Sequence, residues 1–384
     1  MRSDSGASAK PSNFCEKFAK TVLWVGDQWL TVFAKHSYPT SPEYVSVSIM
    51  REAMFYEKLA DDKVKCHLCN HFCTIAPNKR GICSVRENRK GVLYSLVYGR
   101  VIASGVDPIE KKPLFNLLPG TESFSIATAG CNFKCRWCQN WNISQISRTA
   151  KEIPGHDMTP EDVVWSATQH DCKTIAYTYT EPTIFTEFAL DVMKLAHKSG
   201  IKNVFVTNGY TSEEALSEIS QYLDAGNIDL KAFRDETYRK MCGARLEPVL
   251  DTIRRYRELG IWLEVTTLVV PTVNDSEEEL REIARFIADV DVAIPWHISQ
   301  FYPQHRFLDA PSTPVEVLHR AREIGIEEGL RYVYEGNIPG MGNENTYCYK
   351  CKELLIKRFG FSIIENRIED GKCFNCGAEI DGVF

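Results

Sequence analysis

The chain has 384 residues, a formal net charge of -6 and a pI of about 5.9, and its charges are mixed along its length. A chain without a basic stripe lacks the electrostatic footprint of a nucleic-acid-binding protein, so we expect a small molecule or a protein as partner. Most of the 14 cysteines fall in short-spaced groups. In a chain of this size such groups indicate metal binding in a reducing compartment, and we expect a cytosolic protein.

Residues 1–49 form a leader that is rich in serine at its start. Its most apolar stretch, residues 21–34, is too short to span a membrane and contains Asp27, so no membrane role is expected. We expect the leader to be either a poorly ordered tail or a segment that precedes a true start at Met50. The alternative is a short amphipathic helix around residues 24–33 that docks on the body.

Residues 50–120 are expected to form a small β-rich domain, because alternating apolar runs with glycine turns, such as VLYSLVYGRVIASG, are typical of β-hairpins. This part carries four cysteines in C-x2-C-x3-C-x9-C spacing, which could bind zinc or an auxiliary iron-sulfur cluster. We favour zinc, because the segment is loop and hairpin like a zinc knuckle. An electron-relay cluster is the alternative. We name these residues the N-terminal cysteine group: Cys66, Cys69, Cys73 and Cys83.

The stretch DPIEKKPLF follows and places Glu110, Lys111 and Lys112 just before the next region. A solvated charge run and a lid that faces the substrate are both open interpretations.

Between residues 121 and 340, short apolar runs alternate with segments of helical period. Several of the helical segments open with Thr, Ser or Asp and have an acidic residue in the first turn. Continuous apolar strands separated by helices predict parallel βαβ units and an α/β fold, here a partial (β/α)6 TIM-like barrel. The expected strands are residues 123–129, 173–179, 203–208, 227–233, 262–270, 293–299 and 330–336, and the expected helices are residues 160–169, 184–198, 213–222, 248–259, 276–289 and 314–328.

The first expected strand runs directly into a C-x3-C-x2-C motif, the cysteine triplet of Cys131, Cys135 and Cys138. The triplet therefore lies at the carboxyl edge of the strands, where βα barrels build their sites. Three thiolates can bind three irons of a cubic [4Fe-4S] cluster and leave the fourth iron open to another ligand. The alternative is a zinc site that a distant residue completes.

The triplet spacing, with Trp137 before its last cysteine, resembles the radical S-adenosylmethionine (SAM) superfamily, in which SAM binds the open iron through its amino and carboxylate groups. On this resemblance, Glu181 and Pro182 correspond to the end of the GGEP motif that holds the SAM ammonium group. Tyr179 and Thr180 replace the two glycines of that motif, so this chain departs from the pattern there.

Further residues at the ends of the expected strands complete the predicted SAM site. Asp229 and Lys231 lie two apart, so they share one face of a strand, where unpaired charges would be costly. His297 is either a buried core residue or a contact to SAM or substrate. The glycines near Asn337 and Ile338 would let the backbone approach adenine. The predicted SAM contacts are Trp137, Thr180, Glu181, Pro182, Asn208, Asp229, Lys231, His297, Asn337 and Ile338.

The motifs CHLCNHFC, GICSVRENRKG, DPIEKKPLFNLLPG, SIATAGCNFKCRWCQNW, AYTYTEPT, VTNGY and IDLKAF together resemble the radical SAM enzymes of the AmmeMemoRadiSam system, relatives of pyruvate formate-lyase activating enzymes. The resemblance covers the chain from about residue 50 onward. It implies that an external donor reduces the cluster, that SAM is cleaved to a 5'-deoxyadenosyl radical, and that this radical abstracts hydrogen from a small molecule or a protein partner. It also implies AMMECR-like and Memo-like partner proteins.

Residues 341–384 hold two C-x2-C pairs on a predicted strand-turn-strand, which is typical of a zinc ribbon. We name these residues the C-terminal cysteine group: Cys348, Cys351, Cys373 and Cys376. The isolated Cys15, Cys172 and Cys242 are expected to be small packing residues. Two other function classes stay open, a non-catalytic iron-sulfur electron carrier and a zinc-binding scaffold.

Overall fold

The computed structural model describes residues 18–25, 28–35, 50–338 and 343–384, and the chain divides into two compact units, Met1–Ser48 and Ile49–Phe384. In the first unit, β1 (Phe18–Val25) and β2 (Gln28–Lys35) form an antiparallel hairpin in which Trp24 pairs with Trp29. The alternative of a helix over residues 24–33 is therefore wrong for the residues of this range that the structure describes, since β-branched and aromatic residues in both segments favour strands. The other expectations for the leader lie outside the described residues.

The second unit begins with six short strands that form two three-stranded sheets, ordered β3-β8-β7 and β4-β5-β6. Short strands separated by turns follow the alternating pattern in the sequence. The strands are β3 (Arg51–Glu52), β4 (Tyr56–Lys58), β5 (Val64–Cys66), β6 (Thr74–Ile75), β7 (Arg86–Arg89) and β8 (Val92–Ser95).

A nine-stranded sheet is the centre of the second unit, with the order β11-β9-β10-β12-β13-β14-β15-β16-β17. Strands β10 and β12 to β17 run parallel, and β9 and β11 are antiparallel additions at one edge. The strands are β9 (Arg100–Pro108), β10 (Glu122–Thr128), β11 (His156–Asp157), β12 (Thr174–Tyr177), β13 (Lys202–Thr207), β14 (Ala225–Asp229), β15 (Trp262–Val269), β16 (Trp296–Gln300) and β17 (Val333–Gly336).

Helices connect the parallel strands, as the periodicity predicted. Thr159 and Asp162 form a capping box at the start of α2, and Ser212 and Ser276 cap α4 and α7. The long helices are α2 (Pro160–Gln169), α3 (Thr186–Lys198), α4 (Glu213–Ile219), α6 (Glu247–Glu258), α7 (Glu277–Val290) and α8 (Val315–Glu327), and the short ones are η1 (Ile109–Lys111), α1 (Trp141–Ser144), η2 (Ile146–Arg148), η3 (Pro182–Phe185), α5 (Asp235–Thr237) and the π-helix η4 (Tyr238–Cys242). No helix among the described residues has both the length and the apolar character that crossing a membrane requires.

The two faces of the sheet differ in what covers them. Phe124 and Ile126 of β10 belong to the main hydrophobic cluster together with residues of the helices, whereas Ser125 between them contacts the segment of residues 107–118. The same segment contacts β14 and β15, because Asn227 donates to the Pro113 carbonyl and two backbone amides donate to the carboxylate of Glu264. Residues 107–118 therefore cover the face of the sheet opposite the helices.

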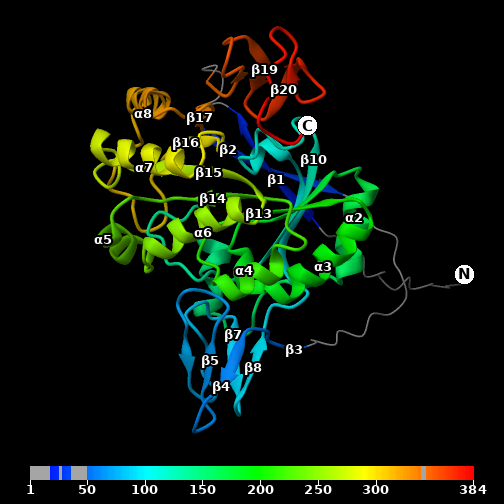
Figure 1. Ribbon diagram of the computed structural model, residues 1–384. Coiled ribbons are helices and arrows are strands. Elements are labelled where there is room, and N and C mark those ends of the chain that lie inside the picture. The colour runs from blue at the N-terminus through cyan, green and yellow to red at the C-terminus, as the bar shows by residue number, and fades with distance from the viewer. Residues whose placement is uncertain (1–17, 26–27, 36–49, 339–342) are drawn as a thin grey trace, which may run out of the picture. The chain divides into compact units, whose positions relative to one another are not determined.

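The C-terminal part forms two small antiparallel sheets, β18-β19-β20 and β21-β22, from β18 (Thr346–Tyr347), β19 (Leu354–Phe359), β20 (Ser362–Asn366), β21 (Ile368–Glu369) and β22 (Lys372–Cys373). The strand-turn-strand predicted between the two C-x2-C pairs is present as β19 and β20. Leu117 pairs with Val383, so this part contacts residues 107–118. Figure 1 shows β19 and β20 at one end of the main sheet and β4, β5, β7 and β8 at the other end.

Candidate active site

The loop after β10 carries the cysteine triplet. β10 ends at Thr128, and Gly130 then adopts a φ of +108°. A Cβ atom on Gly130 would lie 2.8 Å from Val85 Cγ1 and 3.2 Å from the carbonyl oxygen of Cys83. The loop therefore needs a glycine where it passes the N-terminal cysteine group. The three cysteines follow directly, at the carboxyl edge of the parallel strands.

Backbone contacts hold this loop in place. The amides of Lys134 and Arg136 donate to the carbonyl groups of Cys242 and Met241 at 2.8 and 3.0 Å, which joins the loop to η4. The guanidinium of Arg148 donates to two carbonyl groups of the loop at 3.0 and 3.2 Å. Because the backbone between the cysteines is fixed on both sides, the three side chains are held in a defined arrangement.

Hydrogen-bond donors surround the sulfur atoms of the triplet. Cys131 Sγ accepts from the amide of Phe133 at 3.3 Å and from Asn208 Nδ2 at 3.9 Å, and Cys138 Sγ lies 3.3 Å from Ser144 Oγ. Donors of this kind favour the thiolate over the thiol. Burial acts in the opposite direction and raises the pKa of Cys131 well above its ordinary value. Binding of iron needs the thiolate form, so a cluster at this loop would form with release of protons.

Cys242, to which sequence reasoning assigned no chemistry, lies beside the triplet. It is the last residue of η4, is only 1% exposed, and forms a hydrogen bond with Cys135. This bond lowers the pKa of Cys135, and it raises the pKa of Cys242 well above its ordinary value. A π-helix such as η4 often marks a functional site. The contact between η4 and the triplet loop could not be predicted from the sequence, because the two segments are far apart in the chain.

Glu181 joins the ends of β12 and β13 next to the triplet. Its Oε1 accepts from the hydroxyl groups of Thr183 and Thr207, both at 2.7 Å, and its Oε2 accepts from the amide of Asn208 at 2.8 Å. Asn208 in turn donates to Asn132 Oδ1 in the triplet loop at 2.8 Å. Burial raises the pKa of Glu181, and these hydrogen bonds counteract that rise. The structure thus brings the predicted residues Glu181 and Asn208 to the triplet.

Three more predicted residues lie around the same edge. Thr180 donates to the carbonyl of Thr128 at 2.9 Å, and Pro182 begins η3 and is buried. The indole of Trp137 is 5% exposed and packs edge-on against Phe307, with ring centroids 5.9 Å apart. These contacts fix the rim of the candidate site rather than leaving it as a free loop.

Asp229 and Lys231 form an ion pair of 2.8 Å, whereas the sequence interpretation favoured a functional role over an ion pair for these two charges. Burial opposes the charge on Lys231, but the carboxylate of Asp229 raises the pKa of Lys231 well above its ordinary value. The charge of Lys231 also acts on Cys135 and Cys242, which places this ion pair beside the triplet.

His297 does not lie at the candidate site. It is the second residue of β16, which continues to Gln300, so it sits near the start of the strand and not at its carboxyl end. Its Nε2 lies 2.6 Å from Glu264, and its ring packs edge-on against Phe115. His297 therefore has the surroundings of a buried core residue, which was the alternative to a contact with SAM or substrate, and it is a partner of residues 107–118.

Asn337 and Ile338 follow the last parallel strand, at the predicted edge. Asn337 has a φ of +63° and donates to the carbonyl of Gln300 at 3.0 Å, so it closes the carboxyl ends of β16 and β17. Ile338 is half-buried against the main hydrophobic cluster.

Lys112, one of three charged residues in DPIEKKPLF, is 1% exposed and is paired with Asp107 at 2.6 Å. The interpretation of this run as a solvated charge run is wrong for Lys112 and for Glu110, which is also fully buried. The ammonium of Lys112 lies 4.6 Å from the centre of the Tyr179 ring, and the hydroxyl of Tyr179 donates to Asp107. Tyr179 stands where the GGEP motif has a glycine, so this departure connects residues 107–118 to the rim.

The C-terminal cysteine group converges on one point. Its four sulfur atoms lie within 4.8 Å of one another, and the pairs Cys348–Cys376 and Cys351–Cys373 are each 3.7 Å apart. One zinc ion bound by four thiolates at about 2.3 Å places the sulfur atoms about 3.8 Å apart, so the spacing fits a metal ion of this kind.

Comparisons with known proteins agree with this arrangement. A family model described as "Radical SAM superfamily" matches residues 125–287. The uncharacterized protein MJ0808 of Methanocaldococcus jannaschii is 49% identical over 335 residues, which cover 86% of this chain and 99% of that protein. The pyruvate formate-lyase-activating enzyme of Clostridium pasteurianum is 22% identical over 54% of this chain and 89% of that enzyme.

A further relative, the isethionate sulfite-lyase activating enzyme of Oleidesulfovibrio alaskensis, is 29% identical over 147 residues, which cover 36% of this chain and 46% of that enzyme. The match to the family model begins within β10 and includes the triplet, Glu181, Asn208 and the Asp229–Lys231 pair. The chain belongs to the radical SAM superfamily, is homologous to activating enzymes of glycyl-radical enzymes, and is a radical SAM enzyme.

Proposed function

We propose that the cysteine triplet binds the [4Fe-4S] cluster of this enzyme within a partial (β/α)6 barrel, and that Cys131, Cys135 and Cys138 each ligate one iron. The observation that carries the proposal is a loop held from both sides at the carboxyl edge of a parallel sheet, with three cysteines and hydrogen-bond donors to their sulfur atoms. When bound, a reduced cluster of this type supplies one electron that cleaves SAM to methionine and a 5'-deoxyadenosyl radical.

The rim residues would bind and orient SAM. Glu181 and Asn208 place a carboxylate and an amide next to the triplet, and Asp229 and Lys231 supply a charged pair on its other side. An acidic group facing the SAM ammonium and donors facing its carboxylate are the chemistry that such a ligand needs. The other proposed contacts of the SAM site are Trp137, Thr180, Pro182, Asn337 and Ile338.

The radical would then abstract hydrogen from a substrate that the homologues suggest is a protein. Pyruvate formate-lyase and isethionate sulfite-lyase activating enzymes are among the relatives, so a glycine of a partner protein is the favoured hydrogen donor. The motif resemblance to AmmeMemoRadiSam-system enzymes adds AMMECR-like and Memo-like proteins as partners. An external one-electron donor completes the reaction. The described cysteines form no disulfides, which supports a cytosolic location.

We further propose that the C-terminal cysteine group is a zinc ribbon. The sulfur spacing of 3.7 Å supports zinc, and the strands β19 and β20 supply the hairpin of such a ribbon.

Anaerobic reconstitution with iron and sulfide, followed by reduction and addition of SAM, tests the proposed function. We expect 5'-deoxyadenosine from the native chain and none from Cys135→Ala. The matched control is Cys242→Ser, which keeps a hydrogen-bonding group beside Cys135 and should retain product. Product that persists in Cys135→Ala would contradict the cluster assignment. If the native chain failed to bind SAM and Cys242→Ser bound it, Cys242 would be a fourth ligand of the cluster. This outcome would contradict the open iron.

A further inference from the structure

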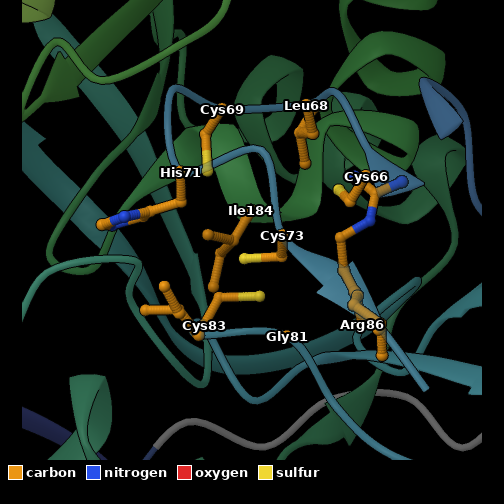
Figure 2. A pocket seen from close by; sticks show the side chains of 11 residues that line it. Cys66, Leu68, Cys69, His71, Cys73, Gly81, Cys83, Arg86 and Ile184 are labelled. Atoms are coloured by element: carbon orange, nitrogen blue, oxygen red, sulfur yellow. The ribbon is translucent and has the colours of Figure 1, made fainter. Parts of the chain in front are cut away.

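The N-terminal cysteine group surrounds a cavity. Figure 2 shows its four sulfur atoms pointing into a common space, while the ring of His71 points away from it. Apolar side chains complete the walls, among them Leu68, Ile75 and Ile184. All four cysteines line this one cavity together with these side chains.

The spacing of these sulfur atoms differs from that of a zinc site. Among the residues that the structure describes, the C-terminal cysteine group alone brings three or more metal-binding side chains within 4.8 Å of one another. The N-terminal sulfur atoms are therefore spread more widely around their cavity. A single zinc ion draws four thiolates together, whereas an iron-sulfur cube holds them farther apart because each thiolate binds a separate corner.

Arg86 adds a second and independent observation. Its side chain is 1% exposed and lines the cavity. One nitrogen donates to Glu187 at 2.7 Å, but Nε and Nη1 have no hydrogen-bond partner in the described structure. Buried donors without partners are costly, so a ligand with acceptor atoms is expected in this space. The sulfide and thiolate sulfur atoms of an iron-sulfur cluster are acceptors of this kind.

We propose that the N-terminal cysteine group binds an auxiliary [4Fe-4S] cluster and not zinc, which reverses the preference drawn from the sequence. Cys66, Cys69, Cys73 and Cys83 each ligate one iron, so no iron is left for a substrate. Arg86 donates hydrogen bonds to the cluster and compensates part of its negative charge. The chemistry left to such a cluster is transfer of single electrons.

The cavity lies next to the triplet loop, so the cluster on the triplet is the acceptor for an electron from the auxiliary cluster. His71, between two cysteines of the group, lies 2.9 Å through its Nε2 from the carbonyl of Asn132 in the triplet loop. Arg148 donates to the carbonyl of Ile82 at 2.6 Å and to that of Cys131 at 3.0 Å, so one guanidinium joins the two cysteine loops. The auxiliary cluster is thus a neighbour of the triplet.

The auxiliary cluster therefore relays electrons to the cluster on the triplet. This role rests on the proposed function, but the presence of the auxiliary cluster does not. An external one-electron reductant of the ferredoxin or flavodoxin class reduces the auxiliary cluster. That cluster is then oxidised by one electron as the cluster on the triplet is reduced by one electron. No atom and no bond moves in this step.

Metal analysis of a chain in which all three triplet cysteines are alanine tests the cluster. After anaerobic reconstitution we expect about four irons and four sulfides per chain, about one zinc, and an electron paramagnetic resonance signal on reduction with dithionite. Adding Cys69→Ala and Cys73→Ala should remove the iron, and adding Cys172→Ala as a matched control should not. A chain without iron and with about two zinc ions would overturn the proposal. SAM cleavage is not measured, so failure of the proposed function leaves this result unaffected.

Arg86 and the relay have their own measurements. In the triplet-free chain, the double variant Arg86→Gln with Glu187→Gln should shift the reduction potential of the remaining cluster to more negative values, and an unchanged potential would refute the role of Arg86. In the chain with an intact triplet, Cys69→Ala with Cys73→Ala should lose flavodoxin-driven formation of 5'-deoxyadenosine and keep formation driven by dithionite. Equal loss with both reductants would refute the relay.

Discussion

Figure 1 shows β5 and β7 at one end of the main sheet and β19 and β20 at the other. The N-terminal cysteine group belongs to the first part and the C-terminal cysteine group to the second, and each part contains a buried arginine, Arg86 in β7 and Arg358 in β19. At the carboxyl edge, Arg86 lines the cavity of the N-terminal cysteine group and keeps two nitrogen atoms without partners. At the other end, Arg358 of β19 donates to the carbonyl groups of Phe115 and Glu344 at 2.8 and 3.1 Å. One arginine faces the space between its cysteines, and the other binds the backbone of the neighbouring segments.

This difference agrees with the two proposed roles, an auxiliary cluster at the N-terminal cysteine group and a structural zinc site at the C-terminal cysteine group. The carboxyl edge of parallel strands is where βα folds place their reactive groups, and the amino edge contributes mainly to stability. The N-terminal group touches the triplet loop through His71 and Arg148. The C-terminal group instead secures residues 107–118, which cover one face of the sheet. The uses that we propose for these two similar cysteine motifs therefore differ with the end of the sheet at which they lie.

The largest expected effect comes from removing the zinc that we propose for the C-terminal cysteine group. Cys348 is fully buried, and structural zinc in small domains contributes about 10 kcal/mol or more to folding, so Cys348→Ala should destabilise the C-terminal part by about 5 kcal/mol or more. Zinc analysis and urea unfolding of the full chain measure this effect. Cys73→Ala is the matched variant in the other group and should leave the zinc content unchanged. Full zinc content in Cys348→Ala would contradict the proposal that the C-terminal cysteine group binds zinc.

Arg358 offers the next largest effect. It is buried, it donates to Phe115, and its Nε lies 3.8 Å from the carboxylate of Glu110, which is also buried. Arg358→Ala leaves that carboxylate uncompensated and should cost about 3–5 kcal/mol in the free energy of unfolding. The double variant Arg358→Met with Glu110→Gln should recover part of the loss, because it removes both charges. If the single and double variants unfold alike, Arg358 does not act through this charge.

The parts that sequence reasoning predicted are those with local signals. The α2 helix has the expected bounds because Thr159 and Asp162 form a capping box, and the triplet lies after β10 because a buried strand runs directly into it. Asp229 and Lys231 lie close together as their two-residue spacing suggested, but the ion pair that they form was the less favoured interpretation.

The parts that it missed depend on contacts between distant segments. Cys242 meets Cys135 only because η4 folds against the triplet loop, and nothing near either cysteine reports this contact. His297 was expected near the end of a strand over residues 293–299, but β16 begins only at Trp296, so His297 lies at its start and contacts Glu264 and Phe115 from other segments. Burial of Lys112 requires Asp107 and Tyr179 from two other segments, so the charge run by itself reads as exposed.

Asp107 tests whether ion pairs within residues 107–118 also stabilise this segment, in addition to its contacts with the C-terminal part. Burial opposes ionisation, but the ammonium groups of Lys112 and Lys111 lower the pKa of Asp107 well below its ordinary value. Its stabilising contribution is therefore present above about pH 4 and is lost as the pH falls below that value. Asp107→Asn should cost about 2–3 kcal/mol at pH 7, and the difference from the native chain should shrink toward pH 3.

Urea unfolding of both proteins at several pH values measures this difference. Burial also lowers the pKa of Lys112 from its ordinary value of 10.5 to about 8. The buried charge of Lys112 therefore lowers the free energy of unfolding below pH 8, and this loss should disappear as the pH rises from 8 toward 10.5. The double variant Asp107→Asn with Lys112→Met removes the unpaired ammonium group and serves as control. A difference that stays constant between pH 7 and pH 3 would show that the pKa of Asp107 is not lowered in the folded chain.

The smallest expected effect comes from Arg367, which lies in the C-terminal part but does not reach the sheet. Its guanidinium stacks over the ring of Phe374 at 3.7 Å and pairs with Glu353 at 3.3 Å near the surface. Contacts of this kind contribute about 0.5–1 kcal/mol, so Arg367→Ala should lower the free energy of unfolding by no more than that and leave the zinc bound. A loss as large as that of Arg358→Ala would mean that surface contacts stabilise the C-terminal part as much as the buried contacts of Arg358 do. The special role given to Arg358 would then be wrong.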